Sequence, residues 1–137
     1  MATDARTLAR IHRVRTLQLT LARAEEARAR NTVATETALS ARVAQLAEAV
    51  APVSGDAVTL VAAAHYRERL GVSALAAIAR VGAAEADVYR AAAHARAAKQ
   101  DQSAVEKLIE RGGRDAVARE RRAQEEAGPG RKRHDPC

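Results

Sequence analysis

The stretch from residue 51 to residue 56 reads Ala-Pro-Val-Ser-Gly-Asp, and it predicts the turning point of the chain. It is the one place in the first 110 residues where Pro, Ser, Gly and Asp cluster. Proline lacks a backbone donor and clashes with a preceding helical turn, whereas Ser and Asp favour the first position of a new helix. We therefore expect one helix to end before Pro52 and another to begin after Asp56.

Both flanks of this stretch have the composition of long helices. Of the 137 residues 36 are alanine, and the chain has no Trp, no Phe and two Tyr. Alanine is the best helix former but buries little surface, and aromatic residues supply much of the burial in a globular core. The composition therefore favours long helices over a compact core. The two aromatic side chains, Tyr66 and Tyr89, are expected to be partly buried between the helices.

Apolar residues recur at helical spacing on both sides of the turn. Before the turn, one stripe comprises Leu8, Ile11, Val14, Leu17, Leu21 and Ala24, and a stricter one comprises Leu39, Val43, Leu46, Val50 and Val53. After it, the expected inner face comprises Val58, Val61, Leu70, Leu75, Ile78, Val81, Val88, Ala92, Ala95, Gln102, Val105 and Ile109. Within this face, Val81, Val88, Ala95, Gln102 and Ile109 are spaced by seven, as in the seam of a coiled coil.

We predict an all-α fold, a long antiparallel two-helix coiled-coil hairpin over residues 1–127 with a disordered basic tail at residues 128–137. The first helix, roughly residues 4–50, is about 70 Å long. The second helix runs back beside it from the turn and reaches the level of its start at about residue 104. The arms are then unequal, and residues 105–127 project without an intramolecular partner. Gly112 and Gly113 are expected to break this projection, and Gly71 to Ser73 could interrupt the second helix earlier.

Positive charge is concentrated at the two ends of the chain. The formal net charge is +6, with seven Arg against three acids in residues 1–30 and eight basic against five acidic residues in 111–137. The hairpin brings both ends to one pole, which would attract acidic surfaces. Nucleic acid is a possible partner of such a pole, but base stacking needs aromatic side chains and the chain has only two.

Catalytic and metal-binding constellations are not apparent, and we expect no enzymatic activity and no cofactor. His65 and Glu68 have a metal-compatible spacing, but the second half of such a site is missing, so a surface pair is expected. Gly112-Gly113 lacks the Lys-Ser/Thr of a phosphate-binding loop. Cys137 is a terminal thiol without an anchored environment, and neither a membrane-spanning run nor a secretory signal is apparent.

Three stretches resemble the flagellar FliJ family and its injectisome relatives of the YscO type. They are LARIHRVRTLQLTLARAEEARAR at residues 8–30, HYRERL at residues 65–70 and VEKLIER at residues 105–111. The resemblance implies a non-enzymatic antiparallel coiled coil that acts as the stalk of the type III export ATPase ring. It also implies contacts with export-gate proteins and export chaperones, at the cytoplasmic side of the cell membrane. The Gly112-Gly113 pair departs from the unbroken helix expected there.

For this chain, the resemblance implies a partner-binding region that combines the end of the second helix with the arginine-rich start of the first helix. The residues concerned are Val105, Glu106, Lys107, Leu108, Ile109 and Arg111, with Arg6, Arg10 and Arg13. Three alternatives stay open from the sequence: an injectisome stalk, a basic coiled coil associated with nucleic acid, and a self-assembling structural coiled coil.

Overall fold

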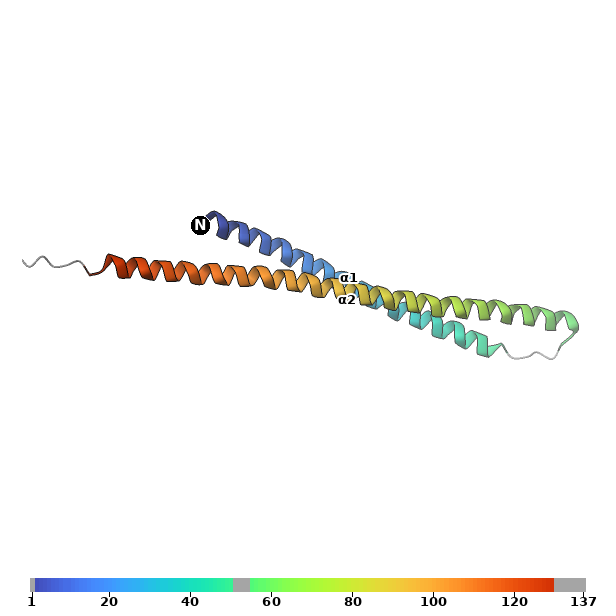
Figure 1. The fold of residues 1–137 in the computed structure, drawn as a ribbon. Helices are drawn as coiled ribbons and strands as arrows, with labels where there is room; N and C mark the ends of the chain where they lie inside the picture. Colours follow the sequence, from blue (N-terminus) through green and yellow to red (C-terminus); the bar gives the residue numbers. More distant parts are fainter. Residues whose placement is uncertain (1, 51–54, 130–137) are drawn as a thin grey trace, which may run out of the picture. The chain divides into compact units, whose positions relative to one another are not determined.

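A computed structural model describes residues 2–50 and 55–129, and within them the chain forms two helices and no strand (Figure 1). Helix α1 spans Ala2–Ala49, 48 residues, and helix α2 spans Ala57–Ala127, 71 residues. The two helices pack against each other, so the all-α hairpin is confirmed. Residues 51–54 of the predicted turn and residues 130–137 of the predicted tail lie outside the described residues.

Helix α2 begins where the sequence predicts, because Asp56 caps it. The backbone N–H of Thr59 donates a hydrogen bond to Oδ1 of Asp56 at 3.0 Å, and the hydroxyl of Thr59 donates to the same oxygen. These are the hydrogen bonds of a helix N-cap, since they satisfy a donor that has no partner within the helix. The Thr59 side-chain and backbone hydrogen bonds lower the pKa of the Asp56 carboxyl, because they favour its charged form.

Replacement of Asp56 by Ala is expected to lower the thermal unfolding midpoint at neutral pH. A carboxyl whose pKa is lower in the folded than in the unfolded protein stabilises the fold above its unfolded pKa. That contribution is lost as the pH falls through the folded pKa. The difference between wild type and Asp56→Ala in thermal unfolding should therefore be present at pH 7 and shrink steadily below about pH 4. A difference that stays constant down to pH 2 would contradict this assignment.

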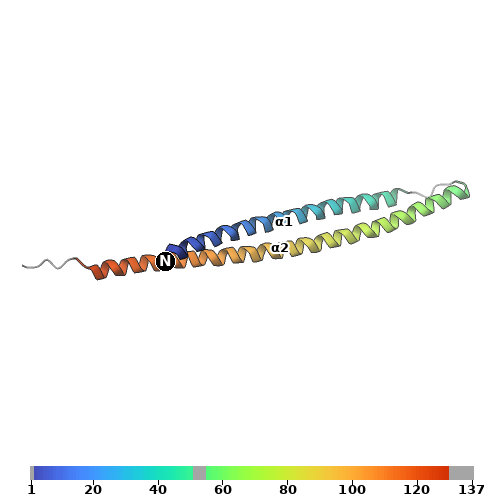
Figure 2. The ribbon, with the colours of Figure 1, turned by 90° about the horizontal axis from the view of Figure 1, so that it is seen from above.

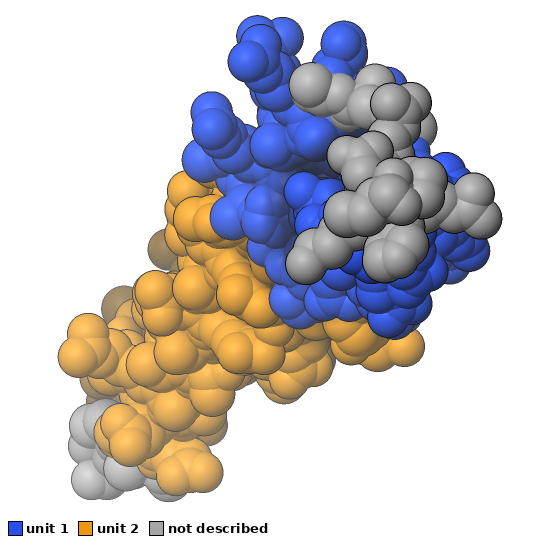
Figure 3. All heavy atoms as spheres, turned by 90° about the vertical axis from the view of Figure 1, so that its left-hand side faces the viewer, with its two compact units in different colours: residues 1–18, 98–137 blue, residues 19–97 orange. Residues whose placement is uncertain are grey.

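The structure divides into two compact units, coloured separately in Figure 3. Residues of both helices belong to each unit. Unit 1 contains residues 1–18 and 98–137, and unit 2 contains residues 19–97. In unit 2, Glu36 pairs with Arg80 at 3.1 Å and Glu25 with His94 at 3.8 Å. Residues later in α1 thus face residues earlier in α2, which confirms the antiparallel pairing.

The contact surface between the helices is a regular seam with alternating steps of three and four residues. On α1 the buried and half-buried positions of this seam are Leu8, His12, Arg15, Leu19, Ala22, Glu26, Ala29, Val33, Glu36, Ser40, Val43, Ala47 and Val50. On α2 the alternating series comprises Leu70, Ala74, Ala77, Val81, Ala84, Val88, Ala91, Ala95, Ala98, Gln102 and Val105, and Ala63 precedes it by seven residues. The α2 side is mostly alanine, and small contact residues let helices pack closely.

The first apolar stripe predicted on α1 is confirmed only at its two ends, where Leu8 and Ala24 are half-buried. Ile11, Val14, Leu17 and Leu21 are all exposed, and the seam passes through His12, Arg15 and Leu19 instead. Further along, Val43 and Val50 are half-buried as predicted, whereas Leu39 and Leu46 are exposed. Val53 lies outside the described residues. Polar pairs account for this choice at the start of α1: Asp101, Gln102 and Glu106 of α2 bond Arg15, Thr16 and His12 of α1.

On α2 the seven-residue spacing is confirmed at Val81, Val88, Ala95 and Gln102, which are buried or half-buried. Ile109 continues the series but is exposed. The looser parts of the predicted inner face are wrong, since Val58, Val61, Leu75 and Ile78 are exposed. The tyrosines are also more exposed than predicted: Tyr66 is half exposed, and Tyr89 is 75% exposed.

The predicted break at Gly112-Gly113 and the interruption near Gly71 are both wrong, because α2 is continuous from Ala57 to Ala127. Among the described residues only Gly128, just after the helix, has a positive φ, of 44°. Glycine there is the usual end of a helix, since other residues are strained in this conformation. Helix α2 therefore carries Gly112 and Gly113 in ordinary helical conformation, at a cost in backbone entropy.

Replacement of both Gly112 and Gly113 by Ala is expected to stabilise the protein by about 1–2 kcal/mol in total. A Cβ atom at either position would meet no atom within 4 Å, so alanine gains helix propensity without a clash. Urea unfolding followed by circular dichroism measures the change. Unchanged or lower stability of the double variant would show that the glycines serve a contact that the helix alone does not reveal.

The register of the hairpin shortens the predicted overhang. The first residues of α2, through Ala62, are all exposed and run beyond the end of α1 (Figures 1 and 2). From the length of the first helix alone, α1 is expected to lie alongside these residues. In unit 1, consequently, Val105 is buried, with 8% of its surface exposed, and Glu106 contacts α1. The prediction that the chain lacks an intramolecular partner from Val105 onward is therefore wrong.

Candidate functional site

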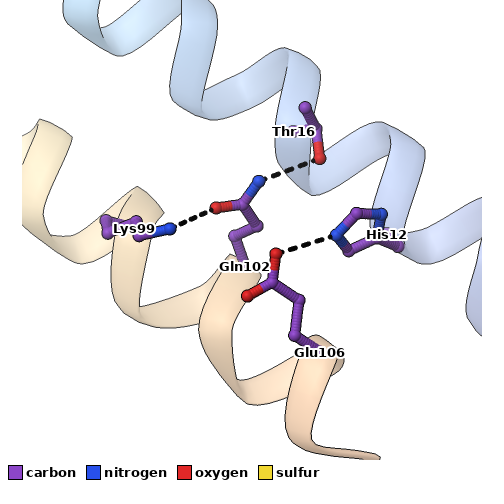
Figure 4. Close-up of polar contacts among 5 residues, drawn as sticks. All are labelled: His12, Thr16, Lys99, Gln102 and Glu106. Carbon is purple, nitrogen blue, oxygen red and sulfur yellow. Dashed lines mark hydrogen bonds and ion pairs between the residues drawn. The ribbon is translucent and has the colours of Figure 1, made fainter. Parts of the chain in front are cut away.

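Unit 1 has a polar network in its seam, drawn in Figure 4. Gln102, the one buried polar residue among those described, donates from Nε2 to Oγ1 of Thr16 at 3.0 Å and accepts from Nζ of Lys99 at 2.9 Å. One turn further, Nε2 of His12 lies 3.1 Å from Oε1 of Glu106. Each bond joins a specific pair, and a buried polar residue that shifted register would lose its partners. The network therefore fixes the register of α1 against α2 in this unit.

Arg15 extends the network to one side of unit 1. Its Nη1 donates to Oδ2 of Asp101 at 3.1 Å and to Oε1 of Gln18 at 3.1 Å. Gln18 of α1 and Asp101 of α2 therefore lie on the same side of the seam. In a coiled coil, residues seven apart occupy equivalent positions. Ile11, seven before Gln18, and Leu108, seven after Asp101, consequently lie next to each other on this side.

These two residues belong to an exposed apolar row on unit 1. The row comprises Ile11, Val14, Leu17 and Leu108, which are between 39% and 64% exposed. On α1 each side chain of the row neighbours the next at a step of three, so the row winds around the helix from Ile11, beside α2, to Leu17 on the outer side. An exposed row of large apolar side chains is typical of a surface that another protein covers.

A basic row lies beside the apolar row on the outer side of α1. Arg6, Arg10 and Arg13 are exposed and spaced by four and three, so they share one face of the helix. Among the described residues none of the three makes an ion pair, whereas Arg15 is held by Asp101. The described part of α2 in unit 1 is neutral, with seven basic and seven acidic residues. The positive charge of the described part of unit 1 thus comes from the start of α1.

We call the two rows together the apolar–basic face, with residues Arg6, Arg10, Ile11, Arg13, Val14, Leu17 and Leu108. Of the partner-binding residues predicted from the sequence, it contains Leu108 and the three arginines. Val105 lies in the seam, Glu106 lies beside it and contacts His12 of α1, and Lys107 and Arg111 are exposed on α2.

A groove lies at the end of unit 1, where the seam opens. Its volume is about 940 Å³, and Leu8 of α1 and Ile109 of α2 are among the residues that line it. Small residues line it from both helices: Ala5 and Ala9 on α1, and Gly112, Gly113, Ala116 and Ala118 on α2. Asp4, Asp115, Arg119 and Arg122 complete its lining. Ile109 is therefore placed at the groove and not in the tightly packed seam.

His65 and Glu68 form a surface pair, as the sequence predicts. Nδ1 of His65 lies 3.9 Å from Oε2 of Glu68, and both side chains are about three-quarters exposed. Among the residues that the structure describes, no three His, Cys, Asp or Glu gather closely enough to hold a metal ion. The same described residues contain no helix that could span a membrane.

Comparison with models of protein families, with curated proteins and with solved structures found no match to this chain. The sequence interpretation missed the network of His12, Arg15, Thr16 and Gln102, although the series Leu8, His12, Arg15 and Leu19 has the spacing of a seam. The signal was hidden because a search for apolar residues skips polar seam positions.

Proposed function

We propose that this protein is a non-enzymatic stalk or chaperone-like component of the bacterial flagellar type III export apparatus. Its hairpin docks on the export ATPase ring at the cytoplasmic side of the cell membrane, where export-gate proteins and export chaperones are further partners. The proposal joins the family resemblance of residues 8–30, 65–70 and 105–111 with the two-helix hairpin. An injectisome stalk of the same kind would use the same surface.

The observation that carries the proposal is the apolar–basic face of unit 1. Its apolar row supplies the area that a stable contact needs, because removal of large apolar side chains from water drives protein association. Its basic row carries arginines without ion-pair partners in the described chain, which are free to bind carboxylates of a partner. The partner surface should therefore be an apolar groove with an acidic rim.

Nucleic acid fits this face less well. Arginine rows bind phosphate, but sequence-tolerant binding of single strands also uses aromatic stacking. The two tyrosines, Tyr66 and Tyr89, belong to unit 2, whereas the basic row belongs to unit 1. An acidic protein surface is the partner that matches an apolar row beside arginines.

A binding titration with the purified export ATPase tests the proposal. Labelled full-length chain should bind the ATPase ring saturably at micromolar concentrations or below, and the affinity should fall moderately as salt screens the basic row. A parallel titration with DNA should show weak binding that disappears at physiological salt. The proposal fails if the chain does not bind the ring at about 100 µM, or if it binds DNA more tightly than the ring at physiological salt.

A further inference from the structure

Helix α2 carries a second seam that α1 does not cover. Val72, Leu75, Ala79, Gly82, Ala86, Tyr89 and Ala93 follow one another in alternating steps of three and four, and every one of them is exposed. We call this series the outer seam. It lies entirely within unit 2 and contains no charged residue. Alternating steps of three and four over three heptads define a coiled-coil contact surface, so α2 presents one such surface to α1 and another to solvent.

The two seams lie on nearly opposite sides of α2. The inner seam of unit 2 runs through Ala74, Ala77, Val81, Ala84 and Val88, which are buried or half-buried. With 3.5 residues per turn, the outer seam is displaced from it by roughly 150° around the helix axis. A helix packed on the outer seam would therefore not meet α1.

We propose that a second copy of this chain covers the outer seam. The outer seams of the two copies pack against each other, and the two α2 helices run parallel and in register. Charge complementarity supports this occupant and this direction. Between residues 75 and 93, the helix positions directly beside the outer seam hold two charged residues, Glu85 on one side and Arg90 on the other. They are five apart, which is the spacing of the interhelical ion pairs in parallel coiled coils. Glu85 of each copy then faces Arg90 of the other, and Arg90 also pairs with Asp87 of its own helix.

An antiparallel pair about Gly82 would lose this match. Glu85 would then lie beside Ile78, and Arg90 beside Ala76, so no charge would be compensated across the interface. In the parallel pair each seam residue faces its own equivalent. Gly82 faces Gly82, and the two glycines allow close approach of the helices at the centre of the contact.

The exposed area is sufficient for a specific contact. The large side chains in and beside the outer seam are Val72, Leu75, Ile78 and Tyr89, which are 61% to 75% exposed. Together they present on the order of 500 Å² per copy, and self-pairing removes about 1,000 Å² from water, the size at which specific interfaces begin. The alanines between them add to this area. The inference is independent of the proposed function, which uses unit 1.

Sedimentation equilibrium of the full-length protein tests the proposal. Wild type should have twice the 14.6 kDa mass of one chain at tens of micromolar. Ala79→Glu places two carboxylates against each other in the parallel pair and should weaken dimerisation at least 100-fold. Alanine and glutamate are both good helix formers, so its circular dichroism should match that of wild type. Ala104→Glu, at an exposed α2 position outside the outer seam, is the matched control and should stay dimeric.

A cysteine crosslink tests the direction and the register. A Cβ at Gly82 meets no atom within 4 Å, so Gly82→Cys fits the helix, and Cys137→Ser removes the native thiol. Mild oxidation should convert this variant to a disulfide-linked dimer, as it should Ala93→Cys in the same background, whereas Ala104→Cys should dimerise without forming the disulfide link. A monomeric wild type at 100 µM would overturn the proposal and leave the outer seam to a different protein. A dimer that survives Ala79→Glu, or one that links through Gly82→Cys but not Ala93→Cys, would overturn it as well.

Discussion

Replacement of Ala77 by Leu is expected to destabilise the hairpin by about 2–3 kcal/mol. Ala77 is fully buried in the inner seam of unit 2, with 0% of its surface exposed. It lies one turn before Arg80, whose Nε is bound to Glu36 at 3.1 Å. Three added carbon atoms at this position have no space between the helices. They would push α1 and α2 apart and weaken the packing of the neighbouring alanines and the Arg80–Glu36 contact.

Urea unfolding followed by circular dichroism measures this loss, and Ala104→Leu is the control. Ala104 is exposed on the same helix, so leucine there should change the free energy of unfolding by less than about 0.5 kcal/mol. Equal stability of the two variants would mean that the seam is not closely packed at Ala77. A gain in stability at Ala77 would mean that α1 and α2 are held apart by other residues.

Reversal of the basic row, as Arg6→Glu, Arg10→Glu and Arg13→Glu together, is expected to weaken binding to the export ATPase about 100-fold, which corresponds to about 2.7 kcal/mol. The three arginines are exposed and make no ion pair within the described chain, so their loss leaves the hairpin intact. Their reversal replaces attraction to an acidic surface by repulsion, which slows association and weakens the complex. The effect should decrease as the salt concentration rises.

The matched control reverses Arg23, Arg28 and Arg42, which are exposed on α1 in unit 2. Net charge changes by the same amount in both triple variants, so a difference between them depends on position and not on total charge. The control should bind within about threefold of wild type, a change of about 0.7 kcal/mol. Equal losses in both variants would assign the effect to net charge and remove the basic row from the docking surface.

The sequence predicts the fold well because the fold depends on local signals. A cluster of helix-breaking residues at 51–56, a capping Asp56 and long alanine-rich flanks leave few alternatives to a helical hairpin. The seven-residue spacing of Val81, Val88, Ala95 and Gln102 also identifies the inner seam of α2 correctly. These features require no knowledge of what lies opposite.

Which stripe of α1 faces α2 could not be predicted in the same way. The largest apolar residues at the start of α1, Ile11, Val14 and Leu17, are exposed, and the seam uses His12 and Arg15. Periodicity finds every apolar stripe but does not say which one the chain itself covers. That choice depends on the alanine surface of α2 and on polar pairs such as Thr16–Gln102, which form only once the register exists. The same choice exposes the apolar row of α1, so Ile11, Val14 and Leu17 entered the candidate site only with the structure, whereas its other four residues were predicted from the sequence.

The most direct test of the proposed function is photocrosslinking in cells from a single position on the apolar–basic face. A photoreactive amino acid at Leu17, 64% exposed in unit 1, should capture the export ATPase, identified by mass spectrometry. The same amino acid at Ala34, exposed on α1 in unit 2, should capture it far less. A crosslink to the ATPase from Leu17 that disappears with the reversal of Arg6, Arg10 and Arg13 is the result we predict. Capture of the ATPase from Ala34 but not from Leu17, or from neither position, would contradict docking through this face.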